Sequence, residues 1–89
     1  DAVAAECRAN GAKVVGIEAD FADLERTAEV VPEAVASLGR LTGLVNNAGI
    51  TGMIGPFLDA PADEDERVMR INVLAPLIPT RSAIPHMAL

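Results

Sequence analysis

The sequence predicts an α/β fold, in which these residues contribute two strands and about three helices to part of a doubly wound parallel sheet. Helix-forming segments alternate with two short apolar runs, Lys13 to Ala19 and Gly43 to Asn47. Both runs are too short for helices, and the first contains β-branched residues that suit a buried parallel strand. A long loop with glycine and proline follows the second run. Strands that alternate with helices are typical of parallel sheets.

The N-terminal segment predicts a helix followed by the first strand. Residues 1 to 10 are rich in helix formers, and Asn10-Gly11 is a typical helix end. The strand covers Lys13 to Ala19, whose apolar run consists of Val14, Val15 and Ile17.

The next segment predicts a second helix with clear ends. Asp23 is a suitable N-cap, and Gly39 is a suitable end. Between them, apolar residues alternate at spacings of four and three, which places them on one helical face; they are Leu24, Ala28, Val31, Val35 and Leu38. Pro32 lacks an amide hydrogen and clashes with the preceding turn, so we expect a kink or a restart there.

The second half predicts a strand, a loop and a last helix. The strand is Gly43 to Asn47, and Ile50 to Pro61 has no period and forms the loop. Carboxylates at positions 63 to 66 favour a helix start, because they complement the helix dipole. The prolines of the last helix predict bends and uncertain boundaries; they are Pro76, Pro79 and Pro85.

Composition excludes several classes of partner. The chain has 89 residues, with 7 basic and 13 acidic side chains and a net charge of -6. This balance argues against binding to nucleic acid or to an anionic membrane surface. No apolar run approaches the roughly 18 residues of a membrane span. The single cysteine, Cys7, cannot form an internal disulfide, so a reducing cytoplasm is expected.

Isolated reactive side chains suggest no further chemistry. The single histidine, the single cysteine and the carboxylates lack the spacing of metal ligands, so we expect no metal site. His86 has no partner at ligand spacing and is expected at the surface. Cys7 has no base near it in sequence, so we expect a buried thiol rather than a nucleophile.

Two positions follow the predicted strands, where ligands bind in open α/β sheets. The first is Asp20-Phe21. Its carboxylate can accept a hydrogen bond from an exocyclic amino group while the next backbone amide donates to a ring nitrogen, and adenine offers both. The alternative is that Asp20 only satisfies backbone donors at the start of the next helix.

The second position is Asn46-Asn47-Ala48-Gly49. Its amides can lock the strand end to its neighbours, and its small residues leave the backbone open to a flat ligand. A simple turn is the alternative interpretation.

These residues belong to a longer pattern. The stretch from Gly39 to Ile50, with Asn-Asn-Ala-Gly at its centre, resembles the short-chain dehydrogenase/reductase family. Further landmarks follow the same order; they are Ala9-Asn10-Gly11, Glu18-Ala19-Asp20, Arg67 to Val73 and Ile84 to Met87. The resemblance therefore covers the chain and implies that residues 1–89 are an internal segment of one NAD(P)-binding domain with a Rossmann-like fold.

The resemblance implies a cofactor-binding set. An aspartate at the position of Asp20 holds the adenine, and the backbone of Phe21 completes the contact. The Asn-Asn-Ala-Gly segment touches the cofactor ribose, and its first residue, Asn46, is mainly structural. The implied set is Asp20, Phe21, Asn46, Asn47, Ala48 and Gly49.

The resemblance also implies one catalytic residue, Asn72. In the family this helix is kinked, so that a backbone carbonyl holds a water of the proton relay. From the residues alone, Asn72 is equally a half-buried helix amide whose hydrogen bonds are satisfied within the fold.

The implied activity is hydride transfer between NAD or NADP and an alcohol or ketone substrate. The family's glycine-rich loop lies upstream of this pattern, and its Ser and Tyr-x-x-x-Lys lie downstream. These residues include no tyrosine, so the chain alone is expected to be inactive. The full-length protein is expected to be a homo-oligomer, a dimer or a tetramer. A non-catalytic nucleotide-binding or regulatory protein of the same fold and an unrelated helical interaction module remain as alternatives.

Overall fold

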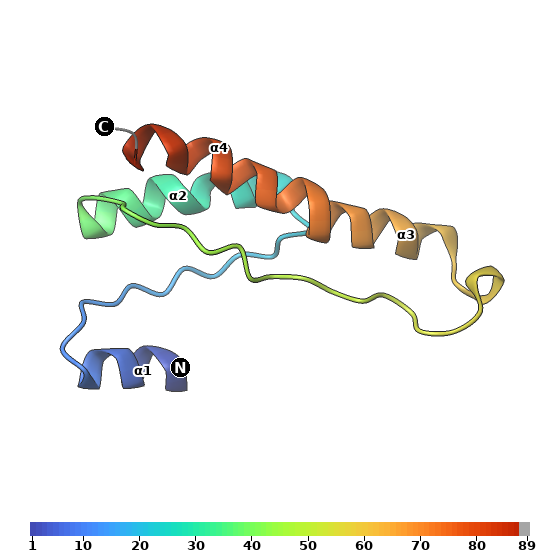
Figure 1. The fold of residues 1–89 in the computed structure, drawn as a ribbon, viewed down its shortest axis with the longest axis horizontal. Helices are drawn as coiled ribbons and strands as arrows, with labels where there is room; N and C mark the ends of the chain where they lie inside the picture. Colours follow the sequence, from blue (N-terminus) through green and yellow to red (C-terminus); the bar gives the residue numbers. More distant parts are fainter. Residues whose placement is uncertain (88–89) are drawn as a thin grey trace.

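The computed structural model describes residues 1–87 as helices joined by extended segments. The elements are α1 (Ala2–Ala9), α2 (Leu24–Leu38), the 3-10 turn η1 (Phe57–Asp59), α3 (Ala62–Met69), the π-helical turn η2 (Arg70–Leu74) and α4 (Ala75–Met87). Figure 1 shows α2 beside α4, and two extended segments between this pair and α1. The expected domain, residues 1–89, ends two residues beyond the described part.

The first two helices confirm the predicted ends. In α1, Asp1 Oδ1 accepts from the amide of Ala4 at 2.8 Å, and Gly11 follows with a φ of 90°. In α2, Asp23 Oδ1 accepts from the amide of Arg26 at 3.0 Å, and Gly39 adopts the left-handed conformation at φ 89°. These caps satisfy backbone groups that the helix itself leaves without partners.

The predicted restart at Pro32 is wrong, because α2 runs through it as one helix of 15 residues. The ring removes only one backbone hydrogen bond, and the bonds on either side keep the helix continuous.

The last three helical elements form one continuous rod (Figure 1). Its irregular part is η2, where the amide of Ala75 donates to the carbonyl of Arg70, five residues earlier. This wider turn precedes Pro76, which lies in the first turn of α4, where a missing amide hydrogen costs least. The prolines do not interrupt α4, which runs from Ala75 to Met87 through Pro79 and Pro85, and the irregular turn lies before Pro76.

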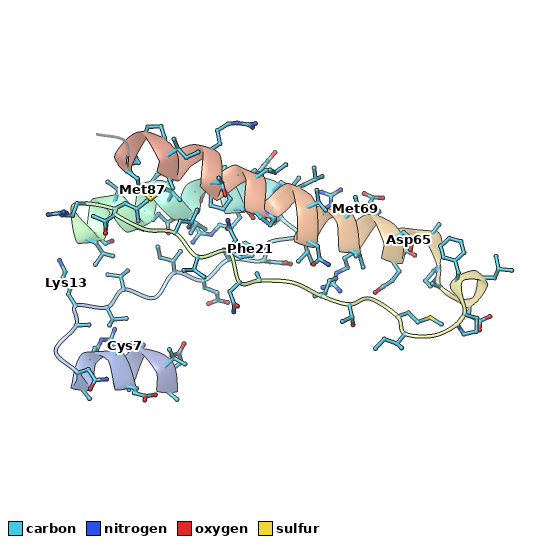
Figure 2. The ribbon with its side chains drawn as sticks, in the orientation of Figure 1. Cys7, Lys13, Phe21, Asp65, Met69 and Met87 are labelled. Carbon is cyan, nitrogen blue, oxygen red and sulfur yellow. The ribbon has the colours of Figure 1, made fainter. Side chains whose placement is uncertain are left out.

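The core is the contact between α2 and the rod. Its buried side chains are Thr27, Val31, Ile71, Ala75, Pro79 and Ala83. Most of them are small, so the two helices approach closely but remove little apolar area from water. Figure 2 shows side chains that extend from the other faces, and Val45, Ile54 and Leu58 are each more than 85% exposed.

The prediction of about three helices agrees with α1, α2 and the continuous rod, whereas the prediction of two strands is not confirmed. Across residues 1–87 there are four α-helices and no strand. Residues 12–20 and 40–54 are extended and run in the same direction (Figure 1), but no backbone hydrogen bond joins them in the described structure. A strand requires a hydrogen-bonded neighbour, and in a doubly wound sheet these two segments are not adjacent.

Two expectations for single residues had different outcomes. His86 is exposed, as predicted. The prediction of a buried Cys7 thiol is wrong, because α1 buries none of its residues and Cys7 is exposed. The described residues contain neither a helix with the length and hydropathy of a membrane span nor a cluster of three metal-ligating side chains.

Candidate functional site

Asp20 lies in a tight turn that leads into α2. Its Oδ1 accepts from the amide of Ala22 at 2.9 Å, and its carbonyl accepts from the amide of Asp23 at 2.9 Å. One carboxylate oxygen therefore satisfies a backbone donor, as in the helix-entry alternative. Asp20 is exposed, so its other oxygen can still accept a hydrogen bond from a ligand.

Arg26 holds the end of the first extended segment. Its Nε and Nη2 donate to the carbonyl of Glu18 at 3.2 and 2.9 Å. Its Nη1 donates to Glu29 and Glu33, which lie on the same helix. The hydrogen bond to Arg26 lowers the pKa of Glu33, and the two carboxylates raise the pKa of Arg26.

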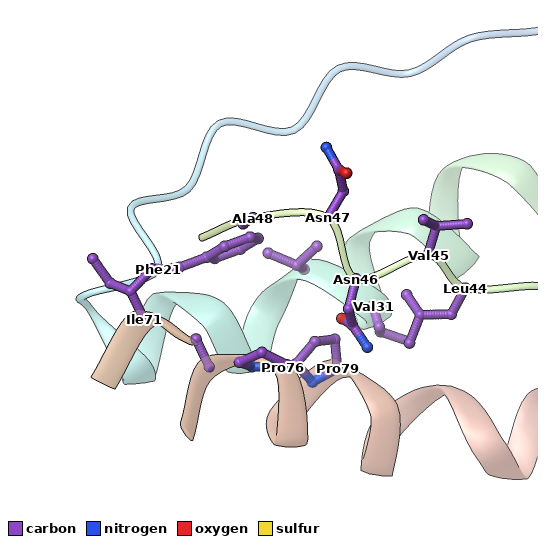
Figure 3. A pocket seen from close by; sticks show the side chains of 12 residues that line it. Phe21, Val31, Leu44, Val45, Asn46, Asn47, Ala48, Ile71, Pro76 and Pro79 are labelled. Carbon is purple, nitrogen blue, oxygen red and sulfur yellow. The ribbon is translucent and has the colours of Figure 1, made fainter. Parts of the chain in front are cut away.

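A pocket of about 170 Å³ brings four of the predicted site residues together (Figure 3). These are Phe21, Asn46, Asn47 and Ala48. Its other walls come from α2 and the rod, including the buried Val31 and Ile71, and they are mostly apolar. Ligand pockets usually have at least about 300 Å³, so this one suits apolar side chains rather than a dinucleotide. The side chain of Phe21 is part of the lining of this apolar pocket.

Asn46 ties the second extended segment to α4. Its Nδ2 donates to Thr80 Oγ1 at 2.9 Å, and Thr80 Oγ1 donates to the carbonyl of Pro76 at 2.7 Å. In Figure 3, Asn46 points toward α4, whereas Asn47 points away from it. The two amides of the Asn-Asn pair thus face opposite directions, as expected for consecutive residues of an extended chain.

Asn72 binds the loop that follows Gly49. The amide of Ile50 donates to Asn72 Oδ1 at 2.9 Å, and Asn72 Nδ2 donates to the carbonyl of Ile50 at 2.7 Å. A Cβ added to Gly49 would lie 3.4 Å from Asn72 Oδ1, so the backbone is close to the side chain. Asn72 therefore joins the π turn to the loop.

The loop then crosses α3 at Gly52. A second pocket of about 290 Å³ lies between them; its walls include Met53, Glu64, Asp65 and Met69. Gly52 has a φ of 71°, and a Cβ there would lie 2.8 Å from Val68 Cγ2. Glycine is thus required both by its backbone conformation and by the close approach.

Replacing Gly52 by alanine in the full-length protein should lower stability by about 1–3 kcal/mol, because the new Cβ suffers left-handed strain and meets Val68. Chemical denaturation measures this loss. Gly11→Ala is the matched control, since Gly11 also has a positive φ but no atom within 4 Å of its added Cβ. Val68→Ala should recover part of the loss in the Gly52→Ala background. Equal losses at the two glycines would contradict the contact.

Three residues that build this geometry were missed by the sequence analysis: Arg26, Ile50 and Thr80. A signal existed for Arg26, because an arginine placed three and seven residues before glutamates on a helix can pair with both. Ile50 acts through its backbone, and nothing in its side chain indicates this. Thr80 is four residues after Pro76, a spacing at which a threonine hydroxyl reaches back to a helix carbonyl.

The sequence model for "short chain dehydrogenase" matches residues 1–88. Among curated proteins, the chain is 36% identical over 84 residues to a short chain dehydrogenase of Pseudocercospora fijiensis, with 92% of this chain and 27% of that protein covered. It is 35% identical over 85 residues to versicolorin reductase 1 of Aspergillus parasiticus, with 96% and 32% covered. The chain therefore spans about a third or less of the length of these relatives.

A comparison with a solved structure agrees with the sequence comparisons. The short chain dehydrogenase of Burkholderia cenocepacia, in complex with NADP, superposes with a TM-score of 0.89 at 32% identity, over 97% of this chain and 35% of that one. This likeness supports the α/β class, although the described residues contain no strand. An unrelated helical module is excluded. The match over residues 1–88 shows that the chain belongs to the short-chain dehydrogenase/reductase family.

Proposed function

We propose that the chain is an internal segment of one NAD(P)-binding Rossmann domain in a longer oxidoreductase. That protein transfers a hydride between NAD or NADP and an alcohol or ketone. The observation that carries the proposal is the family match over residues 1–88. The NADP complex of the Burkholderia cenocepacia relative and the reductase name of the Aspergillus parasiticus relative support the cofactor and the reaction class.

We expect a dinucleotide cofactor to lie along the predicted binding residues. Asp20 ends the first extended segment, and Asn47, Ala48 and Gly49 lie within the second; all four are exposed, and the two segments run in the same direction. Asp20 would hold the adenine, and the Asn47 to Gly49 backbone would lie against the ribose, where small residues permit close approach. Asn46 would contribute by fixing this backbone to α4. The cofactor, when bound, supplies or accepts the hydride.

Asn72 is proposed to act in the proton relay. Pro76 has no amide hydrogen to give to the carbonyl of Asn72, four residues earlier, and η2 widens the helix at the same place. This carbonyl therefore lacks the donor that a regular helix would provide, which suits it to hold a water. The side chain of Asn72 keeps the neighbouring loop in place through Ile50.

The tyrosine and lysine that the family uses would come from residues outside this chain, which contains no tyrosine. The test is to mix the full-length protein with NADH or NADPH and a panel of ketones, and to follow loss of cofactor absorbance. Turnover supports the oxidoreductase. Cofactor binding without turnover of any ketone, or of alcohols in the reverse direction, would favour the non-catalytic alternative.

Asp20→Ala in the full-length protein should weaken cofactor binding by about 1–3 kcal/mol, because a buried donor on the adenine would lose its acceptor. Titration with NAD and NADP measures the change. Asp1→Ala is the control, since loss of the α1 cap should lower the melting temperature without a comparable loss of affinity. Unchanged affinity of Asp20→Ala for both cofactors would exclude Asp20 from the adenine contact.

The full-length protein is further proposed to form a dimer or tetramer in the cytoplasm. Large apolar side chains exposed along the rod support assembly; they are Met69, Val73, Leu77 and Ile84. Light scattering measures the oligomeric state, and a monomeric protein would contradict the proposed assembly.

The lone Cys7 thiol fits a reducing compartment. Cell fractionation tests the location.

A further inference from the structure

The turn from Asp20 to Asp23 is held at both ends by one residue, Arg26. At the first end, the guanidinium of Arg26 donates twice to the carbonyl of Glu18. At the second end, the amide of Arg26 donates to the carboxylate of Asp23. The side chain and the backbone of one residue thus bracket the turn that presents Asp20.

These bonds join the carboxyl end of the first extended segment to α2. Within the described residues, the backbone of this segment makes no strand pairing, and the other bonds near it are at its start: Arg8 donates to the carbonyl of Val14, and Lys13 donates to the carbonyl of Ser37. The carboxyl end of the segment is therefore fixed to α2 through Arg26. Two donors on a planar guanidinium fix both the position and the direction of the Glu18 carbonyl.

The guanidinium also pairs with two carboxylates of α2. Glu29 and Glu33 accept from its Nη1, and Glu33 also accepts, at 3.2 Å, from the Nη2 that donates to Glu18. The Arg26 side chain is 29% exposed, and its single positive charge faces two negative carboxylates. Arg26 is therefore poorly suited to bind a cofactor phosphate and well suited to hold backbone.

We propose that Arg26 is a positioning residue for adenine binding: it fixes the Glu18 carbonyl, and thereby places the Asp20–Asp23 turn where the Asp20 carboxylate and the Phe21 amide meet the adenine. This inference rests on the proposed function. Arg26 does not touch the cofactor, and its removal leaves the nicotinamide side unchanged.

The test uses Arg26→Met in the full-length protein, which keeps the aliphatic stem and removes the donors. The dissociation constants of NADPH and NADH, and that of reduced nicotinamide mononucleotide, which has no adenine, are measured by fluorescence titration. We expect the dinucleotide that the protein uses to bind roughly tenfold more weakly, about 1.4 kcal/mol. The mononucleotide should bind as before. Arg26→Lys, with one ammonium in place of the fork, should recover only part of the loss.

The control is the double variant Glu29→Gln, Glu33→Gln, which removes the ion pairs and leaves both bonds to Glu18 in place. Exposed ion pairs contribute little, so its dinucleotide affinity should stay within about twofold of the wild type. Three results would overturn the inference: unchanged dinucleotide affinity in Arg26→Met, a parallel loss for the mononucleotide, or an equal loss in the control. A wild-type protein that binds neither dinucleotide would refute the proposed function as well, whereas the other outcomes leave that function standing.

Discussion

Asn72→Ala in the full-length protein is expected to lower turnover by about 10²- to 10⁴-fold, the usual range for loss of a proton-transfer group. The substitution keeps the backbone carbonyl but removes both bonds to Ile50. Alanine also favours a regular helix through residues 70–74. The carbonyl of residue 72 and the loop at Ile50 would then no longer be held in fixed positions relative to each other. Steady-state kinetics with saturating cofactor measure the effect, and cofactor affinity should change far less.

Thr80→Val is the matched control for Asn72. Valine has nearly the volume of threonine but lacks the hydroxyl that accepts from Asn46. The substitution therefore removes a second hydrogen bond between the second extended segment and the rod. Turnover should fall by less than about tenfold, because this link lies outside the π turn. A lower melting temperature with normal turnover in Asn72→Ala would show that Asn72 is only a structural amide.

The features that could be predicted from sequence are those set by neighbouring residues. Asp23 and Gly39 mark the ends of α2 because capping depends on bonds within one turn. The strands could not be confirmed in the same way, because a strand exists only through its neighbour. The position of a pairing partner is set by the topology of the sheet and not by the local run.

The residues of the candidate site differ in the same way, because some depend on neighbouring residues and others on distant ones. Asp20 and Asn46 to Gly49 could be found from their positions after apolar runs. The bonds of Asn72 to Ile50 cross 22 residues and engage backbone atoms, which have no sequence signature. Arg26 falls between these cases, since its pairing with Glu29 and Glu33 is local whereas its bonds to Glu18 bridge an irregular turn.

Within the described residues, the two extended segments have no backbone hydrogen-bond partners in each other. In a doubly wound sheet of order 3-2-1-4-5-6, residues 13–19 would form the third strand and residues 43–47 the fourth, and two other strands would separate them. With a strand spacing of ~4.8 Å, they would stand ~14 Å apart. The pocket of about 170 Å³ between residues 44–48, α2 and the rod is apolar, as a site for side chains from a central strand should be.

The 89-residue chain, expressed alone, is therefore expected to be at most partly folded. Its accessible surface is 6605 Å², about a third larger than the ~4,900 Å² of a compact protein of this mass. Its radius of gyration is 15.8 Å, against ~12 Å for a compact domain of this length. Folding into this shape buries only roughly half of the unfolded surface, while each buried unpaired backbone group costs about 1–3 kcal/mol.

Circular dichroism of the isolated chain should show helix without a cooperative thermal transition, and titration with NAD or NADP should show no binding. The α2–α4 contact accounts for the helical signal, because it is the one contact in the described structure that buries a continuous row of side chains. If the chain does gain order, its two extended segments would have to pair with each other, which amide exchange would detect as protected backbone in residues 13–19 and 43–47. The full-length protein, with every strand partnered, should melt sharply under the same conditions. A sharp two-state transition together with nucleotide binding by the 89 residues would refute this prediction, since it would mean that the small side chains between α2 and α4 suffice to offset the chain entropy of the unpaired segments.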